Sequence, residues 1–118
     1  MMIPRTAVLL RIFIGESDRH GHRPLYEAIV MKARELHLAG ATVLRGPMGF
    51  GHSSRLHTAK ILRLSGDLPI VVEIVDSEEQ IGGFLEALES MIGSGLVTTE
   101  KVQVIQYGAQ AGVKSLPP

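Results

Sequence analysis

Apolar and polar residues alternate or cluster along the chain in patterns that predict four strands and two helices. Runs rich in β-branched and apolar side chains predict strands over residues 6–14, 41–45, 68–76 and 101–107. Between them, apolar residues recur at helical spacing in two segments. The first segment follows Pro24 and carries Leu25, Ile29, Ala33 and Leu36, and the second follows Ser77 and carries Ile81, Phe84, Leu85, Leu88 and Ile92.

The ends of these helices have recognisable signals. Pro24 suits a first helical turn, because its fixed φ and missing N–H cost nothing there. Gly40 is expected to stop the first helix in a left-handed conformation. Ser77 with Gln80 fits a capping box, and Asp76 with Glu79 fits one equally well.

The order strand–helix–strand, repeated twice, predicts an α+β fold of the ferredoxin-like type. In that fold, two helices cover one face of a four-stranded antiparallel sheet, and the first and third main strands lie at its centre. We expect one domain over residues 1–108 and a loose tail over residues 109–118. The connection over residues 46–67 has no sustained period, and a connection of this length is often functional.

The sheet face opposite the helices is too apolar to meet water. Alternation along the first and third main strands directs Leu9, Phe13, Val71 and Val75 to that face. Such a patch favours self-association. Arg11 and Glu73 share the face on adjacent strands, so they are expected to pair across the ladder or between subunits, or else to remain ordinary half-exposed charges.

Composition narrows the functional classes. Twelve Lys and Arg balance twelve Asp and Glu in 118 residues, which argues against a general nucleic-acid binder. The absence of cysteine excludes disulfides, thiolate catalysis and cysteine zinc sites. No apolar run reaches membrane-spanning length and no secretory signal is evident, so a cytoplasmic protein with a self-supporting core is expected.

Candidate chemistry lies mostly in loops. The densest glycine cluster, Gly46–Gly51, lets backbone N–H groups approach a ligand, but its spacing matches neither phosphate-binding motif and equally fits a plain turn. His20, His22, His52 and His57 offer a metal imidazole ligands, although solvated loop histidines are the simpler interpretation. His37 instead suits the end of the first helix.

No residue spacing supports catalysis, so we expect a protein that is not an enzyme and has no catalytic residues. Glu16 with Asp18 would form an acid/base pair only in a substrate pocket. The hydroxyl residues Ser53, Ser54 and Thr58 lie near His52 and His57 in sequence, but sequence proximity alone does not make a catalytic triad.

Several ordered segments together resemble the PII-like signalling superfamily, and most closely its uncharacterised branch, domain of unknown function family 190. The resemblance runs from about residue 10 to residue 107. It is carried by the segments GESDRHGHRPLYEAIVMKARE, LAGATVLRGPMGFG, LHTAKILRLSGDLPIVVEIVDSEEQI and GLVTTEKVQVIQYG.

The resemblance implies a trimer with its sheets facing inward, in which residues 46–67 form the T-loop. It also implies an adenine nucleotide in the cleft between subunits at the base of that loop. The implied nucleotide-binding residues are Arg45, Gly46, Gly49, Phe50, Gly51, His52, Gly93, Ser94 and Gly95. His52 falls where PII proteins usually carry a phosphate-contacting arginine, and residues 93–95 resemble the glycine loop that reaches the phosphates of the neighbouring subunit.

The chain departs from PII proteins in its cationic residues. Leu96 stands where a lysine follows the second glycine loop, and Gln106 to Gly112 contains no Arg or Lys. Because such cations would meet the charges of a triphosphate, a less charged ligand such as AMP or a cyclic dinucleotide is easier to accommodate, or no ligand at all.

The resemblance therefore implies a non-catalytic regulator. Its T-loop would change conformation with a small ligand and act on a partner protein, which for PII-like proteins is often a transporter or channel. The alternative is a metal-responsive trimer resembling the CutA copper-tolerance proteins, with His20, His22, His52 and His57 as ligands.

Overall fold

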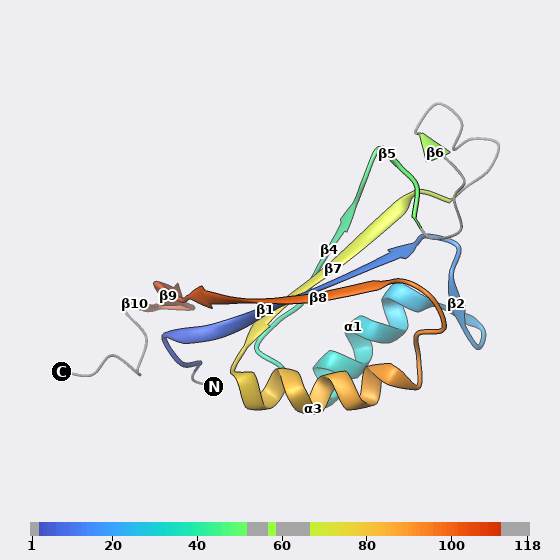
Figure 1. The fold of residues 1–118 in the computed structure, drawn as a ribbon. Coiled ribbons are helices and arrows are strands. Elements are labelled where there is room, and N and C mark those ends of the chain that lie inside the picture. The colour runs from blue at the N-terminus through green and yellow to red at the C-terminus, as the bar shows by residue number, and fades with distance from the viewer. Residues whose placement is uncertain (1–2, 52–56, 59–66, 112–118) are drawn as a thin grey trace.

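The computed structural model describes residues 3–51, 57–58 and 67–111, and it has the predicted ferredoxin-like architecture. Within these residues, helices α1 (Leu25–Glu35) and α3 (Glu78–Glu89) cover one face of a four-stranded antiparallel sheet (Figure 1). The sheet order is β4-β7-β1-β8, with bounds Thr42–Arg45, Pro69–Asp76, Thr6–Gly15 and Leu96–Gln103. The first and third main strands, β1 and β7, are central as expected, and Arg11 lies directly opposite Glu73.

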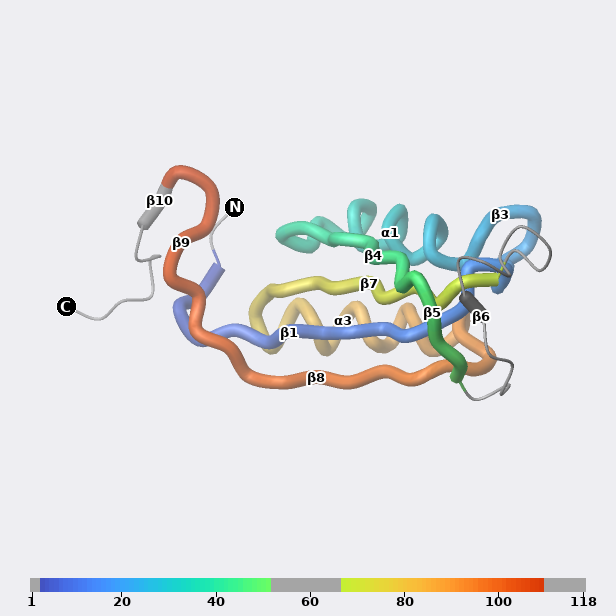
Figure 2. Tube along the Cα trace, turned by 90° about the horizontal axis from the view of Figure 1, so that it is seen from above, coloured from blue at the N-terminus to red at the C-terminus, as the bar shows by residue number. Residues whose placement is uncertain are grey.

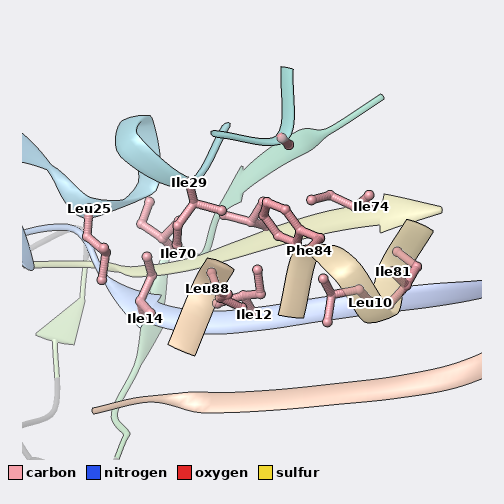
Figure 3. Close-up of a cluster of buried hydrophobic side chains, with 12 residues drawn as sticks. Leu10, Ile12, Ile14, Leu25, Ile29, Ile70, Ile74, Ile81, Phe84 and Leu88 are labelled. Atoms are coloured by element: carbon pink, nitrogen blue, oxygen red, sulfur yellow. The ribbon is translucent and has the colours of Figure 1, made fainter. Parts of the chain in front are cut away.

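The main core lies between the helices and the sheet (Figure 3). Alternate residues of β1 and β7 point into it, which follows from the two-residue period of a strand. Phe84 on α3 and Ile29 on α1 meet them from the helical layer, and both are at most 1% exposed. The buried strand residues are Leu10, Ile12, Ile14, Ile70, Val72 and Ile74.

The start of α3 resolves the two capping alternatives. Ser77 is the N-cap, and its hydroxyl accepts a hydrogen bond from the Gln80 backbone N–H at 3.1 Å. Asp76 is 2% exposed, and its carboxylate accepts from the Ala39 N–H at 2.8 Å and from the Ser77 N–H. This carboxylate therefore ties the segment after α1 to the end of β7.

The predicted end of the first helix is wrong, because His37 rather than Gly40 adopts the left-handed conformation. His37 has φ 63, while Gly40 is not among the described residues with positive φ. The His37 N–H donates to the Arg34 carbonyl and the Leu38 N–H donates to the Ala33 carbonyl. These two bonds form a Schellman motif, which closes the helix three residues before the glycine.

The fourth strand also differs from its predicted bounds. β8 begins at Leu96 instead of residue 101 and ends at Gln103, and Gln106–Tyr107 forms a separate strand, β9. β9 pairs with β10 (Gln110–Ala111), at the start of the expected tail. β8 is an edge strand on which nearly every residue is exposed, so no alternation marks its first half. A second hairpin, β2 (Arg19–His20) with β3 (Arg23–Pro24), lies between β1 and α1.

One end of the sheet's second face is covered by the chain itself. Ile3 and Ala7 are 2% and 1% exposed there, packed by Val75 and by residues that follow β8. The Tyr107 hydroxyl donates to the Ala39 carbonyl at 2.8 Å and anchors this cover. The remainder of the face, toward Phe13, stays open. We call this part of the sheet the open face.

Candidate functional site

The base of the connection over residues 46–67 is held closely against β7. The Gly46 N–H donates to the Pro69 carbonyl at 2.8 Å. A Cβ on Gly46 or Gly49 would lie 2.9 or 3.1 Å from Cγ of Pro69, so side chains at these positions would press on the proline ring. The lack of a side chain at these two positions therefore allows the backbone of the loop to pack closely on Pro69 of β7.

Beyond this base the chain doubles back as a short hairpin. β5 (Met48–Gly49) pairs with β6 (His57–Thr58), with Gly49 opposite His57 (Figure 1). Phe50 is 70% exposed, and a Cβ on Gly51 would meet no atom within 4 Å. His52, together with Ser53, Ser54 and Lys60, lies outside the described residues. The hairpin thus presents a large apolar side chain to its surroundings.

Arg45, the cation expected at this site, is already engaged. Its guanidinium forms an ion pair with Glu16, which follows β1, and the Glu16 N–H donates to the Leu68 carbonyl at 2.8 Å. Asp67 lies beside them and accepts a hydrogen bond from the Ser17 N–H at 2.8 Å. Among the described residues, the base of the connection therefore brings Arg45 close to the carboxylates of Glu16 and Asp67.

The sequence did not indicate the Arg45–Glu16 pair, because Arg45 ends β4 and Glu16 follows β1, far away in the sequence. Glu16 had been considered with Asp18 as an acid/base pair. The Asp18 carboxylate instead accepts from the Gly15 N–H at 2.9 Å and shapes the turn that leaves β1. The only available signal was that β1 and β4, the two strands on either side of β7, end at the same end of the sheet.

The second glycine segment, residues 93–95, precedes β8 on the opposite edge of the sheet from β4 (Figure 2). Gly95 has φ 151, and a Cβ there would lie 2.9 Å from the Phe13 carbonyl oxygen, so this position requires glycine. Gly93 and Ser94 are exposed. The two glycine segments thus extend from opposite edge strands, β4 and β8.

The histidines do not assemble a metal centre in the part of the chain that the structure describes. His20 belongs to β2 and His22 to the turn beside it, and both are exposed. Across residues 3–51, 57–58 and 67–111, no group of three or more His, Asp or Glu side chains is placed to hold an ion. The predicted ligand His52 lies outside these ranges, and only the backbone of His57 is described.

The open face carries alternating apolar and charged rows across the strands. The β-ladder registers align four apolar residues in one row, and all are half-buried or exposed: Leu44, Val71, Phe13 and Leu96. In the next row the Arg11 Nε donates to a carboxylate oxygen of Glu73 at 2.9 Å. The Arg11 Nη1 donates at 2.8 Å to Glu100, which lies one row further along, opposite Leu9. The predicted pairing of Arg11 with Glu73 across the ladder is confirmed.

The contacts of Arg11 with the two carboxylates also affect the pKa of its guanidinium. Its hydrogen bond to Glu73, and then that to Glu100, raises the pKa of the Arg11 guanidinium above its ordinary value. Arginine therefore stays charged on the open face across the whole physiological pH range.

In the described residues, no helix is long and apolar enough to cross a membrane.

The amino-acid sequence matches a known protein family and several similar proteins. The model of DUF190, described as "Uncharacterized ACR", matches residues 7–104. A UPF0166 protein of Aquifex aeolicus is 41% identical over 97 residues, covering 82% of this chain and 91% of that protein. A UPF0166 protein of Methanocaldococcus jannaschii is 34% identical over 92 residues, covering 77% and 84%.

Solved structures with the same fold are PII-like. CPII from Thiomonas intermedia K12, described as a nitrogen regulatory PII-like protein bound to ADP, AMP and bicarbonate, superimposes with a TM-score of 0.65 at 20% identity. That alignment covers 84% of this chain and 88% of CPII. A putative PII-like signaling protein from Thermus thermophilus gives a TM-score of 0.62 at 20% identity, covering 88% and 93%. At this identity the likeness establishes a PII-like fold.

Proposed function

The chain belongs to the DUF190 (UPF0166) family, and from that premise we propose that it is a non-catalytic, PII-like regulator that binds a small adenine nucleotide between subunits. The nucleotide would lie at the base of the connection over residues 46–67, which we now call the T-loop. Arg45, Gly46, Gly49, Phe50, Gly51 and His52 would line it from one subunit, and Gly93, Ser94 and Gly95 from the next.

The observation that carries this proposal is the close packing of the T-loop base on β7. Gly46 and Gly49 hold the loop against Pro69, whereas the side chains of Met48 and Phe50 are exposed. A loop with a fixed base suits a switch, since the ligand has only to bind one arrangement of the loop better than another. The PII-like CPII is described with ADP and AMP bound, which makes an adenine nucleotide the first ligand to test.

The charges at the T-loop base favour a ligand with few phosphates. Arg45 is paired with Glu16, and Asp67 adds a second carboxylate beside that pair. A triphosphate would bring several negative charges toward these carboxylates, while Leu96 and the segment from Gln106 to Gly112 supply no compensating lysine or arginine. AMP, or a cyclic dinucleotide, therefore fits the site better than ATP.

The open face supports assembly of the subunits into a trimer. Phe13, Leu44 and Leu96 are exposed there by 36%, 47% and 56%. Large apolar side chains gathered on one sheet face are typical of an interface. Since the two glycine segments extend from opposite edge strands, a neighbouring copy would bring its residues 93–95 toward the T-loop base of the first.

Titration calorimetry with AMP, ADP, ATP and cyclic di-AMP tests the proposal. Saturable binding with AMP or the cyclic dinucleotide tighter than ATP is the expected result. The same titrations with zinc and copper test the metal alternative, for which the described residues offer no cluster. Heat from a metal alone, with none from any nucleotide, would overturn the nucleotide proposal.

A further inference from the structure

The helical layer contains a groove that the proposed nucleotide site does not use. It has a volume of about 1090 Å³ and is lined by α1, by the last part of α3 and by the β2–β3 hairpin. The helices lie on the side of the sheet away from the open face (Figure 1). The groove therefore remains accessible when the open faces of several copies meet.

Two methionines contribute the largest apolar side chains of the groove. Met31 on α1 is 51% exposed, and Met91, just after α3, is partly buried against the main core. The small side chain of Ala87 is also part of the lining. Methionine side chains are flexible and polarizable, so a surface built from them adapts to a partner's apolar side chains.

The charged side chains of the lining are mostly cationic. Arg23, Lys32 and Arg34 contribute positive charges, and Glu35 contributes the single carboxylate. Glu35 is paired with Lys32 at 3.3 Å, so Arg23 and Arg34 make up the local excess. The Arg23 guanidinium lies against the Met31 sulfur, which brings charge and apolar surface into direct contact. This excess is local, because the chain as a whole has no net charge.

From this combination we propose that the groove docks an acidic amphipathic helix of a partner protein. The apolar side of that helix would pack on Met31 and Met91, and its carboxylates would pair with Arg23 and Arg34. Helix-in-groove recognition uses this arrangement, with apolar anchors one turn apart and charges on the flanks. A concave surface between two helices fits a third helix better than a flat bilayer.

A designed peptide tests the surface chemistry. A fluorescein-labelled helix of about four turns, with leucine at every third or fourth position and glutamate on its other faces, is titrated with the full chain. Fluorescence anisotropy is expected to show saturable binding. The double variant R23E/R34E is expected to bind at least tenfold more weakly, and K101E, which makes the same kind of charge change on β8, is expected to bind normally.

Two further arms make the outcome decisive. Met31→Ser tests the apolar contact without any charge change, with Met48→Ser on β5 as its control, and only the first is expected to weaken binding. Unchanged affinity in R23E/R34E and in Met31→Ser would overturn the proposal. It would also be overturned if a lysine version of the peptide bound equally well, or if the chain bound phosphatidylglycerol vesicles and not the glutamate peptide.

Discussion

Arg11 on β1 joins both of its neighbouring strands on the open face. Its Nε lies 2.9 Å from a carboxylate oxygen of Glu73 on β7, and its Nη1 lies 2.8 Å from Glu100 on β8. All three side chains are partly exposed in the single chain. One arginine between two carboxylates leaves a negative surplus on a face that otherwise favours association through apolar contact.

Reversal of charge at Arg11 tests whether this cluster supports assembly. Arg11→Glu would place three carboxylates together with no cation, so the trimer is expected to dissociate. Light scattering coupled to size exclusion gives the mass, with Lys101→Glu on the same sheet as the control. A trimer of unchanged mass in Arg11→Glu would exclude a role for the cluster in assembly.

The apolar row beside that cluster makes an independent prediction. Phe13 lies opposite both Val71 and Leu96 in the ladders, at the centre of the row. Phe13→Glu would bury a carboxylate without a partner in the assembled face, which is costly, so sedimentation velocity is expected to show monomers. Met31→Glu adds the same charge on the helical layer and is expected to leave the trimer intact. If both variants sediment as trimers, the open face is not the interface.

Gly95 and Gly93 form a matched pair for stability. Gly95→Ala would force a Cβ to 2.9 Å from the Phe13 carbonyl oxygen at φ 151, whereas Gly93→Ala would place its Cβ in open space. Strain of this kind costs about 1–3 kcal/mol of unfolding free energy. Urea unfolding should therefore show a lower midpoint for Gly95→Ala and little change for Gly93→Ala. Equal midpoints would contradict the requirement for glycine at position 95.

The Arg45–Glu16 pair predicts how ligand charge is discriminated. Glu16→Gln removes the partner carboxylate and frees the guanidinium for phosphate. ADP affinity is expected to rise about tenfold, equivalent to about 1.4 kcal/mol, and to rise more than AMP affinity. Glu27→Gln on α1 removes a carboxylate elsewhere and serves as the control. Calorimetry showing the same ADP affinity in Glu16→Gln and the unmodified protein would count against Arg45 as a phosphate contact.

Hydrophobic periodicity predicted the helices and strands that bury one face in the core. It did not predict the bounds of elements whose residues are exposed. Ile29 and Phe84 follow helical spacing because both meet the core, and Arg11 and Glu73 could be paired from strand order alone. Exposed β8 carries no such pattern, so its start was missed. The first helix closes with His37, and not Gly40, in the left-handed conformation. The Schellman hydrogen bonds to the backbone carbonyls of Ala33 and Arg34 mark this end of the helix.

The candidate site was less predictable than the fold for a related reason. Resemblance indicated the two glycine segments, but the contacts that give Gly46, Gly49 and Gly95 their purpose are tertiary. Pro69 and the Phe13 carbonyl oxygen are distant from them in sequence. The same holds for the Arg45–Glu16 pair. Its partners come together only when β4 and β1 pair with the two edges of β7 and end at the same end of the sheet.

Native mass spectrometry of the protein in AMP tests the central proposal most directly, because it counts subunits and ligands together. The account predicts a complex of three chains that carries up to three AMP molecules, with the dissociated single chain carrying none. A monomer that retains AMP, or a complex that binds no nucleotide at any AMP concentration, would contradict a ligand site formed between subunits.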